Sequence, residues 1–269
     1  GFKVLGIAKG GGTDERSLHF LGFVTLWDAP RPEAPAAIRR AREAGVRVLM
    51  ITGDHPTTAG AIAERVGMSG GDVLEGEALD RLSSPELGER LRRTHVFARM
   101  RPEHKLRVVE ALQADGEIVA MTGDGLNDAP ALKRANVGVA MGKSGSDVAR
   151  EVSDVVLLDD DFATIVAAVE EGRVIYDNIQ KFIRFTFSTN VALMLLILGG
   201  AVGSLAFGLR AASGELLLPL TALQILWINF LGDGPPALAL ALDRNSALRR
   251  AAPRKPDTPL LDAASIRYV

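Results

Sequence analysis

Two carboxylates lie close together in the segment Met121–Leu132, which carries more recognisable chemistry than any other part of the chain. The segment reads Met-Thr-Gly-Asp-Gly-Leu-Asn-Asp-Ala-Pro-Ala-Leu. It places Asp124 and Asp128 on one short turn, with Asn127 between them as a neutral donor. Carboxylate oxygens at the carboxyl end of a strand suit Mg²⁺ beside a phosphate group. The sequence therefore predicts a site for Mg²⁺ and phosphate here.

The residues before this turn predict how it is held. The apolar run Ile118–Met121 predicts a short buried strand, so the carboxylates follow directly after its end. Gly123 and Gly125 are expected to give backbone conformations that a side chain would forbid. An Asp-Gly turn that merely caps a helix would explain a lone Thr-Gly-Asp, but it does not explain the whole string.

A second loop of the same type lies upstream. Gly45–Ile51 is another apolar strand, and it is followed by Thr52, Gly53 and Asp54. Between the two loops in sequence, Lys105 lies on a predicted helix that a proline opens. A cation at that position suits the charge that develops on a phosphoryl oxygen.

The strands and helices that would position these loops alternate along the chain. Strands are predicted near 45–51, 95–98, 117–121, 136–141 and 154–158, and helices near 33–44, 56–66, 102–114 and 127–135. This alternation predicts an α/β fold with a doubly wound parallel sheet. Residues 1–27 are expected to form a return strand that leads into this domain. Residues 161–184 are expected to form a helical stalk that continues into the next segment.

Composition restricts the class of protein. The chain has 269 residues, a net charge of −2 and no cysteine, which excludes disulfides and thiolate metal sites. It has no basic excess of the kind that nucleic acid would attract, so no nucleic-acid partner is expected. Because it begins at Gly1 without an initiator Met, we expect a fragment of a longer protein.

The apolar residues are concentrated after residue 184, in two long runs. Phe185–Leu209 contains no charged residue, and Leu216–Leu242 contains only Asp233. Each run is long enough to cross a bilayer core of about 30 Å as a helix. Lys181 and Arg184 precede the first run, and basic residues follow the second: Arg244, Arg249, Arg250, Arg254 and Lys255. The positive-inside rule then predicts a hairpin with both outer ends in the cytoplasm. A pair of helices buried in a soluble domain is the alternative.

Asp233 needs a partner if it lies inside a membrane. A carboxylate near the centre of a span costs roughly 2.5–3.5 kcal/mol on insertion scales, so it usually faces a cavity, a partner or an ion. Asn229 lies four residues earlier, hence on the same helical face. Gly232–Pro236 is expected to be irregular, because proline removes backbone donors and clashes with preceding carbonyls. Carboxylate, amide and freed carbonyl oxygens together favour a site for a hard cation.

The string Met121–Leu132 resembles the hinge motif of P-type cation-transporting ATPases, membrane pumps whose phosphorylation domain belongs to the haloacid dehalogenase superfamily. This resemblance implies Mg²⁺ at Asp124, with Asn127 and Asp128 in the same catalytic loop. Residues 52–54 match the superfamily loop in which the hydroxyl of Thr52 and a neighbouring N–H hold the transferred phosphoryl group. The segment Phe97–Lys105 looks like the one that delivers the phosphate-stabilising lysine.

Two further segments are similar to the family. Asp28-Ala29-Pro30-Arg31 resembles its Asp-Pro-Pro-Arg hinge with one proline replaced by alanine, which puts Asp28 and Arg31 among the residues expected to bind the cofactor. The residues around Gly172–Tyr176 and Lys181–Arg184 resemble its stalk.

The apolar segments are similar to calcium-type pumps. Trp227–Gly234 resembles their sixth transmembrane helix, and Ser188–Val191 resembles the fifth. The resemblance implies that Asn190, Asn229 and Asp233 are ligands of the transported cation. A hydrogen bond between helices is the alternative for Asn190.

Two positions depart from pumps that carry two Ca²⁺ ions. Leu193 stands where those pumps have Glu, and Gly232 stands where they have Thr. A second ion site built from those side chains is therefore not expected. We expect Ca²⁺, carried singly; Mg²⁺, another cation or proton countertransport stay open.

The nucleophile of the family is an Asp in Asp-Lys-Thr-Gly-Thr, a string that does not occur in this sequence. Asp159-Asp160-Asp161-Phe162 resembles the general Asp-x-Asp nucleophile loop of the superfamily. It follows the metal loop instead of preceding it, and Ala163 stands where Thr or Val is usual. We therefore interpret this acidic cluster as the cap of the stalk helix.

Together these residues predict a carboxy-side piece of a P-type cation pump. The expected parts are a partial phosphorylation domain (1–160), a stalk (161–184), a transmembrane hairpin (185–242) and a cytoplasmic tail (243–269). The expected function is ATP-driven transport through an aspartyl-phosphate, with Mg²⁺ and ATP as cofactors. The expected partners are the transported cation, the lipid bilayer and the remainder of the pump. The expected location is the plasma membrane, with the phosphorylation domain in the cytoplasm and this chain inactive alone.

Two alternatives stay open. One is a non-enzymatic membrane remnant or partner subunit. The other is a membrane-anchored phosphatase of the haloacid dehalogenase type, which would use Asp159 as its nucleophile.

Overall fold

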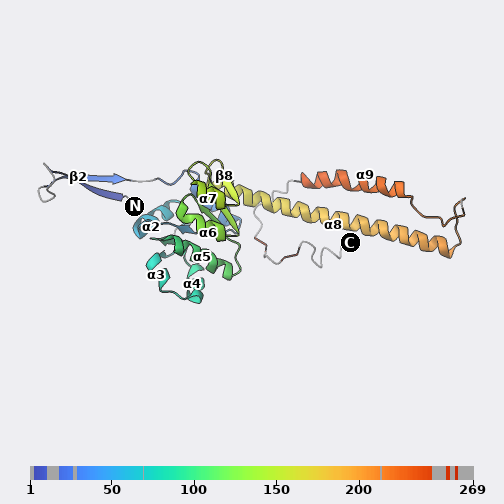
Figure 1. The fold of residues 1–269 in the computed structure, drawn as a ribbon, viewed down its shortest axis with the longest axis horizontal. Coiled ribbons are helices and arrows are strands. Elements are labelled where there is room, and N and C mark those ends of the chain that lie inside the picture. The colour runs from blue at the N-terminus through green and yellow to red at the C-terminus, as the bar shows by residue number, and fades with distance from the viewer. Residues whose placement is uncertain are drawn as a thin grey trace. The chain divides into compact units, whose positions relative to one another are not determined.

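The computed structural model describes residues 3–10, 18–26, 29–68, 70–212, 214–243, 253–254 and 258–259. Within them the chain forms two compact units, Gly1–Ala167 and Ala168–Val269 (Figure 1). The first is an α/β unit and the second is helical, so the predicted fold class is confirmed.

Parallel strands form the centre of the α/β unit, in two sheets of three. One sheet has the order β3-β5-β4, with β3 at Met50–Ile51, β5 at Val96–Ala98 and β4 at Val73–Glu75. The other has the order β6-β7-β8, with β6 at Ala120–Gly123, β7 at Val137–Met141 and β8 at Val155–Leu157. The sequence predicted one doubly wound sheet; among the described residues β3 and β6 are each the edge strand of a separate sheet.

Short helices follow the strands. They are α1 (Ala34–Glu43), α2 (Pro56–Arg65), α3 (Gly76–Asp80), α4 (Ser84–Leu91), α5 (Pro102–Ala114), the 3₁₀ turn η2 (Leu126–Asp128), α6 (Ala129–Arg134) and α7 (Asp147–Val152). Sequence reasoning placed α1, α2, α5 and α6 but missed α3, α4, α7 and strand β4. A signal for α4 was present, because Ser83 and Glu86 form the reciprocal cap that a Ser-x-x-Glu pattern predicts.

An antiparallel pair, β1 (Lys3–Lys9) and β2 (His19–Leu26), occupies the region where a single return strand was predicted. Its apolar side chains stay exposed: Phe23, for example, keeps 71% of its surface accessible. A two-stranded ribbon buries too little apolar surface to be stable alone.

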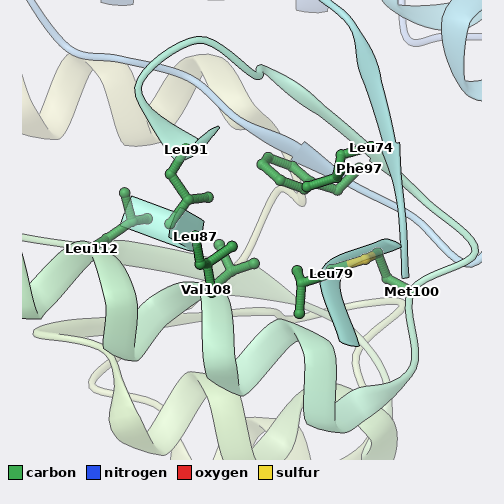
Figure 2. Packing of buried hydrophobic residues seen from close by; sticks show 8 residues of the cluster. All are labelled: Leu74, Leu79, Leu87, Leu91, Phe97, Met100, Val108 and Leu112. Carbon is green, nitrogen blue, oxygen red and sulfur yellow. The ribbon is translucent and has the colours of Figure 1, made fainter. Parts of the chain in front are cut away.

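Helix α5 joins the two parallel sheets through their cores. Its Val108 and Leu112 pack with Leu74, Leu79, Leu87, Leu91, Phe97 and Met100 in one buried cluster, which Figure 2 shows. Its Val109 packs on the other side, in the cluster that contains Met121 of β6. Because Lys105 lies on the same helix, this packing fixes the position of its Cα atom and the direction in which its side chain points.

The helical unit contains most of α8 (Phe162–Ala206) and all of α9 (Ala222–Ala241). Helix α8 is continuous for 45 residues, as the predicted stalk requires. Among the described residues it is the one helix that is long and apolar enough to cross a membrane, judged by length and composition. Helix α9 occupies the second predicted span but does not meet the same criteria of length and hydropathy.

The predicted irregularity near Asp233 is wrong. Helix α9 runs through Pro235 and Pro236 without a break. The missing proline N–H groups nevertheless leave the carbonyls of Leu231 and Gly232 without their usual helical donors. The helix thus keeps its shape, although these two carbonyl oxygens next to Asp233 have no N–H donor four residues further along it.

Candidate functional site

Asp128 is the centre of the loop that follows β6. Its Oδ1 atom lies 2.5 Å from Nζ of Lys105, on α5. Its Oδ2 atom accepts the backbone N–H groups of Asp124 and Gly125, each at 3.3 Å. Only 6% of Asp128 is exposed, so this ion pair is largely removed from water. The structure thus brings together the lysine and the Asp-rich loop that the sequence had predicted as one site.

Gly123 is required at the end of β6, whereas Gly125 is not. A Cβ atom on Gly123 would lie 2.5 Å from Cβ of Asp128, which real Cβ atoms do not tolerate. A Cβ atom on Gly125 would meet nothing closer than 3.8 Å, and its φ of −103° suits any residue. The prediction that both glycines serve backbone conformation is therefore wrong for Gly125, and the need at Gly123 is close packing.

The carboxylate of Asp124 is exposed and has no hydrogen-bond or ion-pair partner among the described residues. Since Asp128 is already neutralised by Lys105, Asp124 leaves this loop with one uncompensated negative charge. Among the described residues no group of three or more acidic or histidine side chains gathers to hold a metal. The donor set still fits Mg²⁺, which commonly takes one or two carboxylates and fills its other positions with water and phosphate.

Asn127 and Lys105 complete the loop's polar surface. Asn127 is exposed on η2, beside the buried Asp128. The ammonium of Lys105 has three N–H donors, of which Asp128 takes one, so two can reach an anion. Lys105 can therefore hold the loop and contact a phosphoryl oxygen at once.

The loop of Thr52, Gly53 and Asp54 is bonded to the segment between β5 and α5. The carbonyls of Thr52 and Asp54 accept the N–H groups of Met100 and Arg99, at 3.0 and 2.9 Å. The Thr52 hydroxyl donates to Oδ2 of Asp54 at 3.1 Å and accepts the N–H of Asp54 at 3.1 Å. The hydroxyl must turn away from Asp54 before it can donate to a phosphoryl group.

The structure gives little support for a cofactor role of Asp28 and Arg31, the two residues predicted to bind a cofactor. Asp28 lies outside the described residues. Arg31 donates from Nη1 to the backbone carbonyl of Asp160 at 2.6 Å, which is a structural contact. A cofactor role for Arg31 stays a prediction.

The acidic cluster after β8 is engaged in local bonds. Asp161 accepts the N–H of Ala163 at 2.8 Å at the start of α8, as the capping interpretation requires. Asp159 accepts the hydroxyl of Thr164 at 2.6 Å and the N–H of Asp161 at 3.1 Å, and these bonds lower its pKa. Nothing in this arrangement favours Asp159 as a nucleophile.

In the helical unit, Asp233 meets an unexpected partner. Oγ1 of Thr189 lies 3.4 Å from Oδ1 of Asp233, and both residues are half-buried. Asn190 instead donates to the carbonyl of Thr186 at 2.8 Å on its own helix, and it is exposed. Asn229 is also exposed. Sequence reasoning missed Thr189, although a threonine next to a predicted ligand in an apolar run was a signal.

The chain is similar to known proteins in both units. A family model of haloacid dehalogenase-like hydrolases matches residues 5–136, and a second model with the same description matches residues 105–169. A model of the cation transporting ATPase C-terminus matches residues 217–269. A calcium-transporting ATPase of Bacillus subtilis is 48% identical over 245 residues, which are 90% of this chain and 26% of that protein.

Two further relatives agree with this match. Calcium-transporting ATPase 1 of Schizosaccharomyces pombe is 43% identical over 100% of this chain and 30% of its own length. Probable cation-transporting ATPase F of Mycobacterium tuberculosis is 45% identical over 99% of this chain and 30% of its own length. The chain belongs to the P-type cation-transporting ATPases. It spans less than a third of the length of these three relatives.

Proposed function

We propose that this chain supplies the phosphoryl-handling loop and part of the cation site of an ATP-driven pump. The observation that carries the proposal is the ion pair between Lys105 and Asp128, with the backbone of Asp124 on the same carboxylate. This arrangement places the cation of Lys105, from α5, beside the turn that carries the free carboxylate of Asp124. A phosphoryl group and a divalent metal need that combination.

Asp124 is proposed to hold Mg²⁺, and Asp128 to hold Asp124 in place. When bound, Mg²⁺ would neutralise charge on phosphoryl oxygens. Lys105 would donate one of its remaining N–H groups to a phosphoryl oxygen, while its bond to Asp128 keeps the side chain oriented. Asn127 and the loop of Thr52, Gly53 and Asp54 would supply further donors, the Thr52 hydroxyl after it leaves Asp54.

The phosphoryl group is proposed to come from ATP and to rest on an aspartate outside this chain. The edge strands β3 and β6 support this: each ends at one of the two loops and has a neighbour on one side only, among the described residues. A parallel strand between them would complete one sheet and would end beside Thr52 and Asp124. The chain alone is therefore expected to show no ATPase turnover, and turnover by the purified protein that is lost in Asp124→Asn would contradict this.

Asp233 is proposed to bind the transported cation inside a membrane, with Asn229 and Asn190 as further candidate ligands and Ca²⁺ as the candidate ion. The half-buried carboxylate and the released carbonyls of Leu231 and Gly232 support this assignment. Because Asn190 is bonded to its own helix, it would have to change rotamer to take part. The rest of a pump is proposed to supply the remaining ligands of the cation, and the lipid bilayer is the other proposed partner. The proposed location is the plasma membrane, with the α/β unit on the cytoplasmic side.

A chimera tests this function. The calcium-transporting ATPase of Bacillus subtilis would have its matching 245-residue segment replaced by this chain, and acid-stable phosphoenzyme would be measured with labelled ATP. The chimera should form phosphoenzyme only with Mg²⁺ and a transported cation. Asp124→Asn should abolish it, whereas the exposed control Asp72→Asn should not. A folded chimera whose phosphorylation is unaffected by Asp124→Asn would contradict the proposal.

A further inference from the structure

Asp160 makes three bonds that neither the capping role nor the proposed chemistry explains. Its Oδ1 atom accepts the backbone N–H groups of Gly142 and Lys143, at 2.6 and 3.0 Å, and its Oδ2 atom accepts that of Ser144 at 2.8 Å. The residue is only 4% exposed. The N–H of Lys143 foremost, with those of Ser144 and Gly142, lowers the pKa of Asp160 to about 2. Its carboxylate is thus an ionised anchor for the loop after β7.

The backbone of Asp160 is itself held in an uncommon conformation. Its φ is +57°, in the left-handed region that residues other than glycine adopt uncommonly. Its carbonyl accepts the guanidinium of Arg31 at 2.6 Å. A residue persists in such a conformation only where its surroundings determine it, and such residues cluster at functional sites.

The loop anchored by Asp160 reaches the candidate metal site. Four residues after Gly142, the N–H of Ser146 donates to the carbonyl of Asp124 at 2.7 Å. The loop is tight, since a Cβ atom on Gly145 would lie 1.9 Å from the carbonyl oxygen of Met141. Arg150 of α7 closes it further by donating to the carbonyls of Gly142 and Gly145. Such a loop transmits a displacement from one end to the other because it has little room to deform.

We infer that Asp160 is a positioning residue for Asp124, acting through the loop of residues 142–146. The bonds run from its carboxylate to the N–H groups of residues 142–144, and from Ser146 to the carbonyl of Asp124. Because Asp160 lies two residues before α8, the same bonds connect the start of that helix with the metal loop. The inference rests on the proposed function only where it treats the Asp124 loop as a Mg²⁺ site.

Amide hydrogen exchange of the full chain in detergent micelles, without metal, tests this link. Asp160→Asn removes the charge and one acceptor from the loop. It should make the N–H groups of Ser146, Asp124 and Gly125 exchange about tenfold faster, since those bonds then open more often. The control is Asp159→Asn, which removes the same charge from the adjacent residue and should leave these three amides unchanged.

A second variant separates the link from a folding defect. Asp160→Gly removes both acceptor oxygens, and with them all three bonds, but it suits the positive φ, so the backbone can keep its conformation. It should accelerate exchange at Ser146, Asp124 and Gly125 as Asp160→Asn does. If both variants accelerate only residues 142–144, Asp160 merely holds its own loop and the inference is overturned.

Mg²⁺ titration by calorimetry then distinguishes this inference from the proposed function. Asp160→Asn should weaken Mg²⁺ binding about tenfold, the lower end of what loss of an outer-shell partner costs, and Asp159→Asn should not. Unaltered affinity in Asp160→Asn, with binding lost in Asp124→Asn, would overturn the positioning role and leave the metal site standing. If the unchanged chain binds no Mg²⁺, the proposed metal site fails, and the exchange experiment alone decides the role of Asp160.

Discussion

The loop after β6 and the surroundings of Asp233 both present a carboxylate for a cation, but they are built differently. Around Asp124, every supporting polar group has a partner: Lys105 and two N–H groups hold Asp128, and Ser146 holds the backbone. Around Asp233, the one side-chain bond among the described residues is a 3.4 Å contact from Thr189. In the first region the polar groups are held in place without a ligand, whereas in the second the carboxylate is held by one long hydrogen bond.

This difference shows which steps each region can perform alone. A site whose donors are fixed by a packed core can orient a phosphoryl group and a metal without reorganising. A half-buried carboxylate with two released carbonyls nearby can bind a cation only when further oxygen ligands approach. The α/β unit should therefore be sensitive to small changes in packing, and the helical unit to changes in ligand chemistry.

The largest effect is expected from Lys105→Met. It leaves the buried carboxylate of Asp128 without its counter-charge, which should lower the free energy of unfolding by about 3 kcal/mol. Urea denaturation followed by circular dichroism would measure this. The exposed pair of Arg134 and Glu110 offers a control, because Arg134→Met should cost less than about 0.5 kcal/mol. Equal losses in the two variants would show that the Lys105 pair is not a buried support.

A smaller loss is expected from Gly123→Ala. The added methyl group would overlap the side chain of Asp128, and overpacking of this kind costs about 2 kcal/mol. Gly125→Ala is the matched control two residues away, where the new methyl group has room. The prediction fails if denaturation ranks Gly125→Ala as the more damaging of the two.

The acid sensitivity of the α/β unit should depend on Asp160. Its backbone donors lower the pKa from 3.8 to about 2 in the folded chain. A carboxylate with a depressed pKa stabilises the fold fully above about pH 4 and loses that contribution as the pH falls toward 2. Unfolding free energies measured across this range should therefore fall less steeply in Asp160→Asn than in the unchanged chain. Parallel curves would contradict the assignment.

The smallest effect is expected in the helical unit, from Thr189→Val. Loss of the hydroxyl near Asp233 should change the cation concentration for half-maximal phosphorylation of the chimera by about threefold, as one weak hydrogen bond allows. Thr186→Val is the control, because the buried Thr186 hydroxyl has no hydrogen-bond partner in the part of the chain that the structure describes. If Thr186→Val shifts the cation dependence as much as Thr189→Val, the contact with Asp233 has no special role.

The sequence predicted most elements near the candidate site because their signals are local. Apolar runs located β3, β5, β6, β7 and β8, and Pro102 located the start of α5. The placement of Lys105 at the same site as the Asp124 loop followed from the order of the motifs, whereas its ion pair with Asp128, 23 residues away, was not predicted. These features depend on short patterns and on one family resemblance.

The features that sequence reasoning missed depend on contacts between distant residues. Nothing in the string Asp159–Asp161 indicated that the middle residue, with a positive φ, would bind the N–H groups of residues 142–144. The bond from Thr189 to Asp233 joins residues 44 positions apart on two helices. Helix α9 also kept its shape through Pro235 and Pro236, because local propensity does not alone decide whether a helix ends.

Cation binding at Asp233 is proposed to be coupled to phosphorylation at the Asp124 loop. Asp233→Asn in the Bacillus subtilis chimera tests this coupling most directly. The measurement is phosphoenzyme formed from ATP as the Ca²⁺ concentration is raised. The unchanged chimera should respond to Ca²⁺, and Asp233→Asn should lose that response while still binding Mg²⁺ at the Asp124 loop. A folded Asp233→Asn chimera with an unaltered Ca²⁺ response would contradict the proposed connection between the carboxylate in α9 and phosphorylation.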